Sequence, residues 1–439
     1  MTSTRTLVHG GVNPPDDRSI SRAAAIMNAA VPSVAVIPLL QHAGRPARAV
    51  VKPGDVVREG MLIGSADGQY SANVHSSIPG RVREIRRIAG HGSRASEAVV
   101  IELGGEFEKS GRRQAVRAWD SLSRADLRAM VRAGGIVGLG GHLVPTHLKL
   151  RDRAPAAPSL LVANGVGSEP SLSADFALMR EKPREIAEGL RICRKIVECG
   201  RVVLAIGEDA EELVPGFEQA FRALGMECEI ALLSSRYPQG NEQLIVAGIE
   251  GADAPAPVSA STIVLNVGTL LAVYEAVVLD RPLIERVVTV TGTPVRMPRN
   301  LKVRLGTRIE DLFDDCGGLA APPGKIVVGG PMRGIAVDTL DVPVTKGTAG
   351  VMVFAGADAR TPTEWPCIRC GSCVEACPWG LVPTRLYKLI QQGELAAARK
   401  EGLARCTECG CCAYACPSHI PLSSVLRSGK QALKRDGNG

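Results

Sequence analysis

Two copies of one cysteine pattern near the C-terminal end constrain this chain more than any other feature. The first copy consists of Cys367, Cys370, Cys373 and Cys377, followed by Pro378, and the second of Cys406, Cys409, Cys412 and Cys416, followed by Pro417. Three closely spaced thiolates suit three corners of an iron–sulfur cubane. The proline ends the tight turn and directs the chain towards the other copy.

Two other uses of such cysteines are a zinc site and a disulfide framework. Zinc needs four ligands and typically takes them as two separated pairs, which leaves the third cysteine of each copy unexplained. Disulfides need an oxidising compartment, and the polar opening sequence MTSTRTLVHGG does not read as a secretory signal. The pattern therefore favours iron–sulfur clusters.

The spacing resembles that of bacterial two-cluster ferredoxins, in which the fourth cysteine of each run binds the other cluster. The resemblance implies two [4Fe–4S] clusters with crossed ligation. One cluster would be held by Cys367, Cys370, Cys373 and Cys416, and the other by Cys406, Cys409, Cys412 and Cys377. Cys411 breaks the ligand spacing, so we interpret it as a neighbour of a cluster rather than a ligand.

Length and composition set wider bounds. A chain of 439 residues with 45% apolar residues predicts two to four domains. The net charge of +7 is spread along the chain without a stripe of Lys, Arg and aromatic residues, which disfavours a nucleic-acid surface. The basic balance suits acidic ferredoxins, nucleotides or a membrane partner. No apolar run approaches the roughly 20 residues that span a bilayer, so we expect a chain that is soluble by itself.

Residues 1–115 are predicted to form an N-terminal arm and a barrel-sandwich hybrid. From residue 35 the chain alternates short β runs with turns such as Gly54-Asp55 and Pro79-Gly80. This resembles biotinyl and lipoyl domains, but the corresponding tip segment, residues 71–77, has no lysine for covalent attachment. A docking or spacer role is therefore expected, and His42 and His75 are interpreted as structural.

Residues 120–252 are predicted to form an α/β domain with a parallel sheet. Apolar strands at 159–164 and 201–207 alternate with helices, including an amphipathic one around 174–198. Ligands of such sheets bind beyond the carboxyl ends of the strands. A glycine-rich loop at 134–141 allows the backbone to approach a phosphate closely, but it does not match the G-x-G-x-x-G pattern. By itself, the loop leaves nucleotide binding undecided.

The same loop carries a resemblance to a known family. Gly138, Gly140 and Gly141, followed by Pro145-Thr146 and Lys149, are similar to the flavin loop of the NADH-binding 51-kDa subunit of respiratory complex I. Nearly the whole chain resembles the RnfC family, the NADH-oxidising subunits of the membrane Rnf complex, through GGVNPP, PLLQHAGRPA, VHSSIPGRV, VVGGPMRG and both cysteine runs. The order of these segments disfavours the related cobalamin-reductase-type proteins of microcompartments.

The resemblance implies a multidomain α/β and β protein. An SLBB β-grasp region would occupy 255–358, and a helical two-cluster ferredoxin-like domain 362–430, with helices after Pro378 and Pro421. It also implies non-covalent FMN, NADH as the substrate and the two clusters as one-electron carriers. The partners would be other subunits of a membrane electron-transport complex, or a ferredoxin or flavoprotein acceptor. The expected location is cytoplasmic, peripheral at the inner face of the cell membrane.

Individual residues take roles from the same resemblance. Cofactor binding is assigned to a set that surrounds FMN, namely Gly138, Gly140, Gly141, Lys149, Asn164, Glu169, Asn266 and Thr269. Glu169 and Glu242 would meet the nicotinamide side, and Lys149 would lie near the flavin or the nucleotide. These three residues, Glu169, Glu242 and Lys149, are the expected catalytic ones.

Three positions depart from the family pattern. Leu143 and Val144 stand where the family has a glycine and an aromatic residue, and Gly167 stands where it has an acidic one. Two interpretations therefore stay open. The chain is either an NADH-dependent oxidoreductase subunit, or a degenerate relay or scaffold, such as a microcompartment cobalamin-reductase-like carrier, that keeps the clusters but has weak or no FMN and NADH binding.

Overall fold

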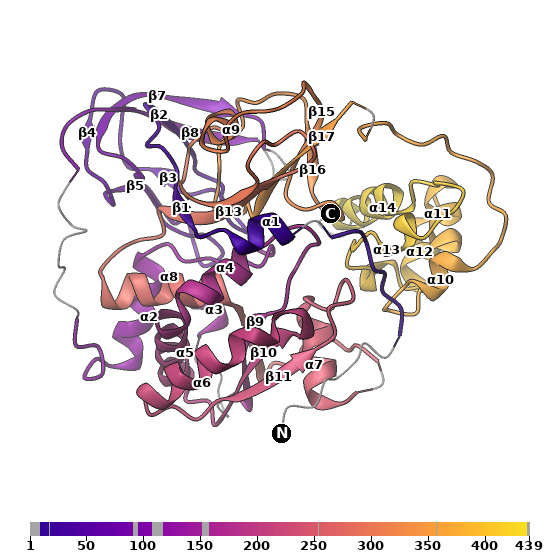
Figure 1. Ribbon diagram of the computed structural model, residues 1–439, viewed down its shortest axis with the longest axis horizontal. Coiled ribbons are helices and arrows are strands. Elements are labelled where there is room, and N and C mark those ends of the chain that lie inside the picture. The colour runs from indigo at the N-terminus through magenta and orange to yellow at the C-terminus, as the bar shows by residue number, and fades with distance from the viewer. Residues whose placement is uncertain are drawn as a thin grey trace.

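The computed structural model describes residues 9–16, 18–90, 95–107, 117–151, 158–252, 254–356 and 358–436. The outer parts of the predicted N-terminal region, residues 1–8 and 108–115, lie outside the described residues. Figure 1 shows an α/β part below, two β modules above it and a helical C-terminal part at one side. The short helix α1 (Ser19–Ala23) lies between these parts.

The N-terminal module consists of two facing antiparallel sheets, in the orders β2-β8-β7-β4 and β3-β5-β6. Their strands are β2 (Val34–Pro38), β3 (Arg48–Ala49), β4 (Val56–Val57), β5 (Leu62–Ser65), β6 (Val74–His75), β7 (Gly80–Ile88) and β8 (Ser96–Leu103). A Cβ on Gly80 would lie 1.9 Å from the carbonyl oxygen of Glu102, so only glycine fits where these strands meet. The predicted barrel-sandwich hybrid is confirmed.

The tip segment at residues 71–77 is packed against the rest of the molecule. Ser71, Ser76 and Ser77 are fully buried, and the Ser77 hydroxyl donates to the carbonyl of Leu305. A segment held in this way cannot swing as a carrier arm, in keeping with the docking or spacer role expected from its lack of lysine.

The α/β part contains a parallel sheet in the order β11-β10-β9-β12. Its strands are β9 (Leu160–Gly165), β10 (Arg201–Gly207), β11 (Glu229–Leu233) and β12 (Thr262–Asn266), and its helices are α2 (Arg124–Ala133), α3 (Thr146–Lys149), α4 (Ala174–Glu181), α5 (Pro183–Val197), α6 (Val214–Ala223), α7 (Glu242–Glu250) and α8 (Val267–Val278). A 3₁₀ segment, η2 (Glu208–Leu213), follows β10. Apolar residues of the strands and of α5 and α8 form the largest core of the described chain.

Two features of this part differ from the sequence prediction. Strand β12 pairs with β9, so the parallel sheet continues past the predicted domain limit at residue 252. The short apolar run of β12 could equally be a strand of the following β region, because such a run does not show which sheet it joins. The helix around 174–198 is two helices, because Pro183 cannot continue the first one and holds Lys182 at a non-helical φ of −131° and ψ of 37°.

The second β module is a six-stranded mixed sheet in the order β1-β14-β13-β17-β15-β16. Its strands are β1 (Met27–Asn28), β13 (Glu285–Thr291), β14 (Arg299–Arg304), β15 (Pro323–Val328), β16 (Ile335–Val337) and β17 (Gly350–Ala355), with helix α9 (Ile309–Asp315) beside them. Strand β1 comes from the N-terminal arm and pairs with β14, and Val12 of the arm bridges to Tyr237. The arm therefore lies across the molecule and joins its parts.

The C-terminal part is helical, as predicted. Its elements are α10 (Ser372–Glu375), α11 (Pro383–Gln391), α12 (Leu395–Lys400), η3 (Leu403–Arg405), α13 (Cys411–Tyr414) and α14 (Leu422–Asp436). Helices α11 and α14 begin shortly after Pro378 and Pro421, the two expected positions. Among the described residues, no helix is long and apolar enough to cross a membrane.

One buried lysine ties three parts of the chain together. Lys346, which precedes β17, is fully buried, and its Nζ donates to the carbonyl oxygens of Asn73 and Gly135, each at 2.7 Å. Its backbone N–H donates to Oε1 of Gln41 at 3.0 Å. Burial lowers the pKa of Lys346 to about 7. The contact therefore joins the barrel-sandwich tip, the end of α2 and the second β module through one group that loses its proton near neutral pH.

The Lys346 junction predicts a pH dependence of stability. The pKa of about 7 lies below the ordinary value of 10.5, so the unfolded chain binds more protons between these two pH values, and the stability at this site rises with pH across that window. The slope is at most about 1.4 kcal/mol per pH unit. Lys346→Met should therefore flatten the rise in thermal unfolding midpoint between pH 7 and 9, whereas the exposed Lys388→Met should follow the wild type. Parallel profiles for wild type and Lys346→Met would contradict this account.

Candidate functional site

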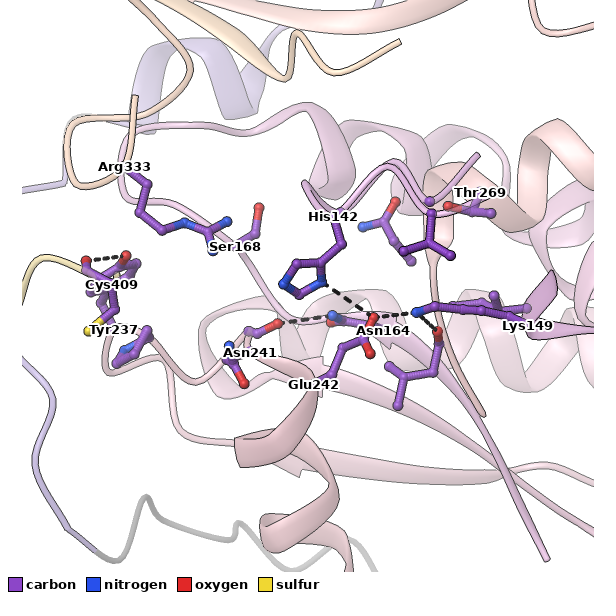
Figure 2. A pocket seen from close by; sticks show the side chains of 18 residues that line it. His142, Lys149, Asn164, Ser168, Tyr237, Asn241, Glu242, Thr269, Arg333 and Cys409 are labelled. Carbon is purple, nitrogen blue, oxygen red and sulfur yellow. Dashed lines mark hydrogen bonds and ion pairs between the residues drawn. The ribbon is translucent and has the colours of Figure 1, made fainter. Parts of the chain in front are cut away.

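A pocket lies at the carboxyl edge of the parallel sheet, where ligands of such sheets bind (Figure 2). It contains about 650 Å³ of space between its walls, part of which is open to solvent. Its walls come from the glycine loop, the ends of β9 and β12, the start of α7, the second β module and the C-terminal part. The lining residues are Gly138, Gly140, His142, Val144, Lys149, Asn164, Ser168, Tyr237, Pro238, Gly240, Asn241, Glu242, Val264, Leu265, Asn266, Thr269, Arg333 and Cys409.

The glycine loop is a tight turn closed by its own backbone. The Gly138 N–H donates to the carbonyl of Val144 at 2.9 Å, and the Leu143 N–H donates to the carbonyl of Gly138 at 3.1 Å. A Cβ on Gly140 would lie 3.2 Å from the Cβ of Asn266, so side chains at the loop would fill the space beside the strand end. Gly138 and Gly140 line the pocket, whereas Gly141 does not. The loop thus leaves room for a group bound against the backbone, as an FMN phosphate requires.

Lys149 and Glu242 form the charged centre of the pocket. Nζ of Lys149 donates to Oε1 of Glu242 at 2.5 Å and to the carbonyl of Val264 at 3.0 Å, and Nδ1 of His142 lies 3.7 Å from the same carboxylate oxygen. Burial opposes ionisation of Glu242, but His142 and Lys149 outweigh it and hold the pKa of Glu242 below its usual value. Glu242 therefore stays ionised at neutral pH, and a positive ammonium lies beside it.

Three of the polar residues expected to bind flavin also hold the pocket walls together. Asn164 donates from Nδ2 to the carbonyl of Gly240 at 3.1 Å. Asn266 donates to Oδ2 of Asp175 at 2.8 Å and accepts from the N–H of Gly268 at 2.9 Å. Thr269 accepts from the N–H of Leu139 at 2.9 Å. All three side chains line the pocket. Their hydrogen bonds hold the neighbouring backbone in place, so they fix the walls against which a ligand would lie.

Glu169 lies elsewhere than the sequence suggests. It is buried outside the lining of the pocket, and its carboxylate accepts from Nε of Arg333 and from the N–H of Met332, both at 3.0 Å. Burial raises the pKa of Glu169, while Arg333 acts in the opposite direction. In this arrangement Glu169 holds a loop of the second β module instead of facing the pocket.

The departures from the family pattern have different structural consequences. Leu143 adopts a φ of 53°, the left-handed conformation that suits glycine, which explains why a glycine is usual there. Its side chain packs towards Gly347 and does not line the pocket, so it does not fill the ligand space. Val144, in contrast, does line the pocket. At Gly167 a Cβ would lie 3.1 Å from the guanidinium of Arg18, so a side chain at this position would meet Arg18.

The lining also contains residues to which sequence reasoning gave no part in the pocket, among them Tyr237, Arg333 and Cys409. The Tyr237 hydroxyl donates to the carbonyl of Cys409 at 2.7 Å, which joins the pocket to the C-terminal part. The available signal was the segment VVGGPMRG, which contains Arg333 and supported the family resemblance but was given no role at the site.

A second cavity, with about 370 Å³ of space that is partly open to solvent, lies in the C-terminal part. Its lining includes Cys377, Cys406, Cys409, Cys411 and Cys412, together with apolar side chains such as Trp379, Leu381 and Leu426. The backbone N–H of Glu408 donates to Sγ of Cys406 at 3.4 Å. Four of these thiols are the set assigned to one cluster, and a largely apolar cavity with an N–H aimed at sulfur fits such a group.

The other predicted set lies nearer the surface. Cys373 and Cys416 are buried in one apolar group with Ile420, whereas Cys367 and Cys370 are exposed. The Trp365 N–H donates to the carbonyl of Ser418 at 2.9 Å, which ties the segment before Cys367 to the residues after Cys416. The Ser372 hydroxyl donates to Sγ of Cys370 at 3.4 Å. The structure thus brings the start of one run beside the end of the other, as crossed ligation requires.

Four domain families match the chain in succession. They are described as the RnfC barrel sandwich hybrid domain (residues 6–106), the Nuo51 FMN-binding domain (131–275), the SLBB domain (287–336) and the 4Fe-4S dicluster domain (365–420). The predictions of FMN and of two [4Fe–4S] clusters are confirmed by these matches, while the roles of individual residues stay predictions.

Curated relatives match most of the chain, and each is the C subunit of its complex. The relative from the proton-translocating ferredoxin:NAD(+) oxidoreductase complex of Clostridium ljungdahlii is 35% identical, over 89% of this chain and 86% of that protein. The relative from the ion-translocating oxidoreductase complex of Rhodobacter capsulatus is 36% identical, over 97% and 83%. The relative from the Na(+)-translocating ferredoxin:NAD(+) oxidoreductase complex of Acetobacterium woodii is 32% identical, over 87% of each chain.

Solved structures share part of the fold. An NAD+-reducing [NiFe]-hydrogenase in the air-oxidised state has a TM-score of 0.51 at 20% identity and covers 66% of this chain and 57% of its own. The same type of enzyme in the H2-reduced state has a TM-score of 0.52 at 19% identity, over 73% and 65%. At this identity the likeness shows the fold alone.

The two cysteine sets predict paired effects of substitution. Cys367→Ala and Cys416→Ala should damage the same cluster, and Cys406→Ala the other, because each cluster takes one ligand from the opposite run. EPR of the reduced protein, with iron and sulfide analysis, measures this against about eight of each per wild-type chain. Cys411→Ala is the matched control and should keep both signals. If Cys416→Ala disturbed the cluster held by Cys406, the crossed pairing would be wrong.

Proposed function

This chain belongs to the RnfC family, and from that premise we propose that it is an NADH-oxidising subunit of an Rnf-type ion-translocating complex. Its proposed reaction takes two electrons from NADH through FMN and passes them singly to two [4Fe–4S] clusters. The other subunits of the complex are its partners.

One observation carries the proposal. Cys409 lines both the pocket at the carboxyl edge of the sheet and the cavity that holds Cys377, Cys406 and Cys412. A flavin held in the pocket and a cluster held in the cavity would thus share one wall residue. Electron transfer weakens steeply with distance, so this shared wall favours exchange between the two sites.

Bound FMN supplies the chemistry that converts a hydride, which carries an electron pair, into single electrons. The residues of this chain bind and orient. We propose that the backbone of Gly138 and Gly140 and the ammonium of Lys149 receive the phosphate side of the ligand, where a fixed positive charge offsets its negative charge. Asn164, Asn266 and Thr269 would keep the adjoining walls in place.

Glu242 has a second proposed task. Its carboxylate lies beside Lys149 and His142 in the pocket and stays ionised, so it can accept hydrogen bonds from a nicotinamide amide or ribose while holding Lys149 in position. Glu169 is not proposed as a direct contact of the nicotinamide, because its oxygens are engaged by Arg333 and Met332.

The other cysteine set marks the side at which a partner would approach. Residues 361–370, which include Cys367 and Cys370, are exposed, whereas Cys377 and Cys412 of the other set are buried. We propose that partner subunits exchange electrons at this exposed end. We also propose that the chain lies at the inner face of the membrane, where NADH is available, as a peripheral part of its complex.

The test is anaerobic reconstitution with FMN and iron–sulfur clusters, followed by addition of NADH. The flavin absorbance near 450 nm should bleach in the wild type. Glu242→Gln should slow this bleaching about tenfold or more, the scale of one charge-assisted hydrogen bond, while dithionite still reduces both clusters. Glu250→Gln, at the other end of the same helix, should behave as wild type.

The contrary result is a fully flavin-loaded wild type that NADH does not bleach. The alternative, a relay or scaffold that keeps its clusters without oxidising NADH, would then stand. Val144, the departure that lines the pocket, would be the first residue to replace by an aromatic one.

A further inference from the structure

The loop between β15 and β16, residues 329–334, reaches from the second β module to both the pocket and the C-terminal part. It is a closed turn in which the Gly334 N–H donates to the carbonyl of Gly330 at 2.9 Å. A Cβ on Gly330 would lie 2.5 Å from the side chain of Glu169, and a Cβ on Gly410 would lie 2.9 Å from the carbonyl oxygen of Met332. The loop is therefore held closely between the α/β part and the cysteine run.

Glu169 fixes the orientation of this loop. Its two carboxylate oxygens are used separately, one by the backbone of Met332 and one by Nε of Arg333, at 3.0 Å each. The Glu169 side chain is only 6% exposed, so these contacts are shielded from water and little screened by salt. The guanidinium of Arg333 is thus held by a buried anchor rather than free to sample many positions.

The other end of the guanidinium faces the pocket. Nη2 of Arg333 lies 3.1 Å from the position of a Cβ on Gly141, and Arg333 lines the pocket together with Tyr237 and Cys409. Figure 2 shows Arg333 extending over Ser168 on the side of the pocket where Tyr237 and Cys409 lie. Glu169 stays outside the lining, so the positive end of the pair is directed inwards.

We propose that Arg333 is a positioning residue that places a fixed positive charge between the flavin pocket and the cluster held by Cys377, Cys406, Cys409 and Cys412, and so favours the reduced form of that cluster. This inference rests on the proposed function. One-electron reduction adds one negative charge to a cluster, and a nearby cation stabilises that charge and raises the reduction potential. The sequence alone gave Arg333 no role, because nothing in VVGGPMRG indicates which site the loop approaches.

The test is a redox titration of the two clusters, followed by EPR, on the full chain without NADH. In Arg333→Gln, the ratio of reduced to oxidised cluster at a fixed potential should fall about tenfold for the cluster beside Cys409, which corresponds to a midpoint lower by about 59 mV for a one-electron couple. The cluster held by Cys367 should keep its midpoint. Arg333→Lys keeps the positive charge, so its midpoint should stay close to that of the wild type. Arg201→Gln, at the amino end of β10, should change neither midpoint.

Two outcomes overturn the proposal. One is an unchanged midpoint in an Arg333→Gln protein with normal iron content. The other is an equal shift in Arg333→Gln and Arg333→Lys, which would mean that shape and not charge matters. If Arg333→Gln loses iron, Glu169→Gln decides, because it removes both the opposing charge and the anchor of Arg333; an unchanged midpoint for the cluster beside Cys409 refutes the idea. Dithionite supplies the electrons, so a failure of NADH oxidation would not affect this result.

Discussion

The arrangement of this protein depends on the contact between the flavin pocket and the cysteine cavity at Cys409. The Tyr237 hydroxyl donates to the Cys409 carbonyl at 2.7 Å, and Cys409 belongs to the walls of both spaces. Electron transfer between two bound groups requires that they stay close, so the chain must hold its α/β part and its C-terminal part in a fixed relation. Several buried polar contacts fix the relative positions of parts of the chain.

Three such contacts join parts that are far apart in the sequence. Lys346 links the barrel-sandwich tip to the end of α2 near the glycine loop. The Glu169–Arg333 pair links the strand end after β9 to the second β module. Val12 of the arm pairs with Tyr237 itself. Each contact places a polar group where burial would be costly without its partner, so each specifies one relative position of the parts it joins.

The sequence predicted the domain types and much of the pocket, because cysteine spacing and glycine turns are local patterns. The family resemblance assigned Lys149 and Glu242 to the same site, and the structure places their side chains in contact. The sequence could not predict that Glu169 would form an ion pair with Arg333, since that contact depends on how two domains pack. It also missed the break at Pro183 and the assignment of β12, because a continuous apolar pattern does not show where one element ends and another begins.

The most direct test of the central claim is NADH reduction of proteins that retain one cluster. With Cys416→Ala, only the cluster beside the pocket should remain, and NADH should reduce it at close to the wild-type rate. With Cys406→Ala, only the cluster at the exposed end should remain, and dithionite but not NADH should reduce it rapidly. Freeze-quench EPR distinguishes these results. Equal reduction by NADH in both variants would contradict the account, because it would mean that the contact at Cys409 does not set the order of electron transfer.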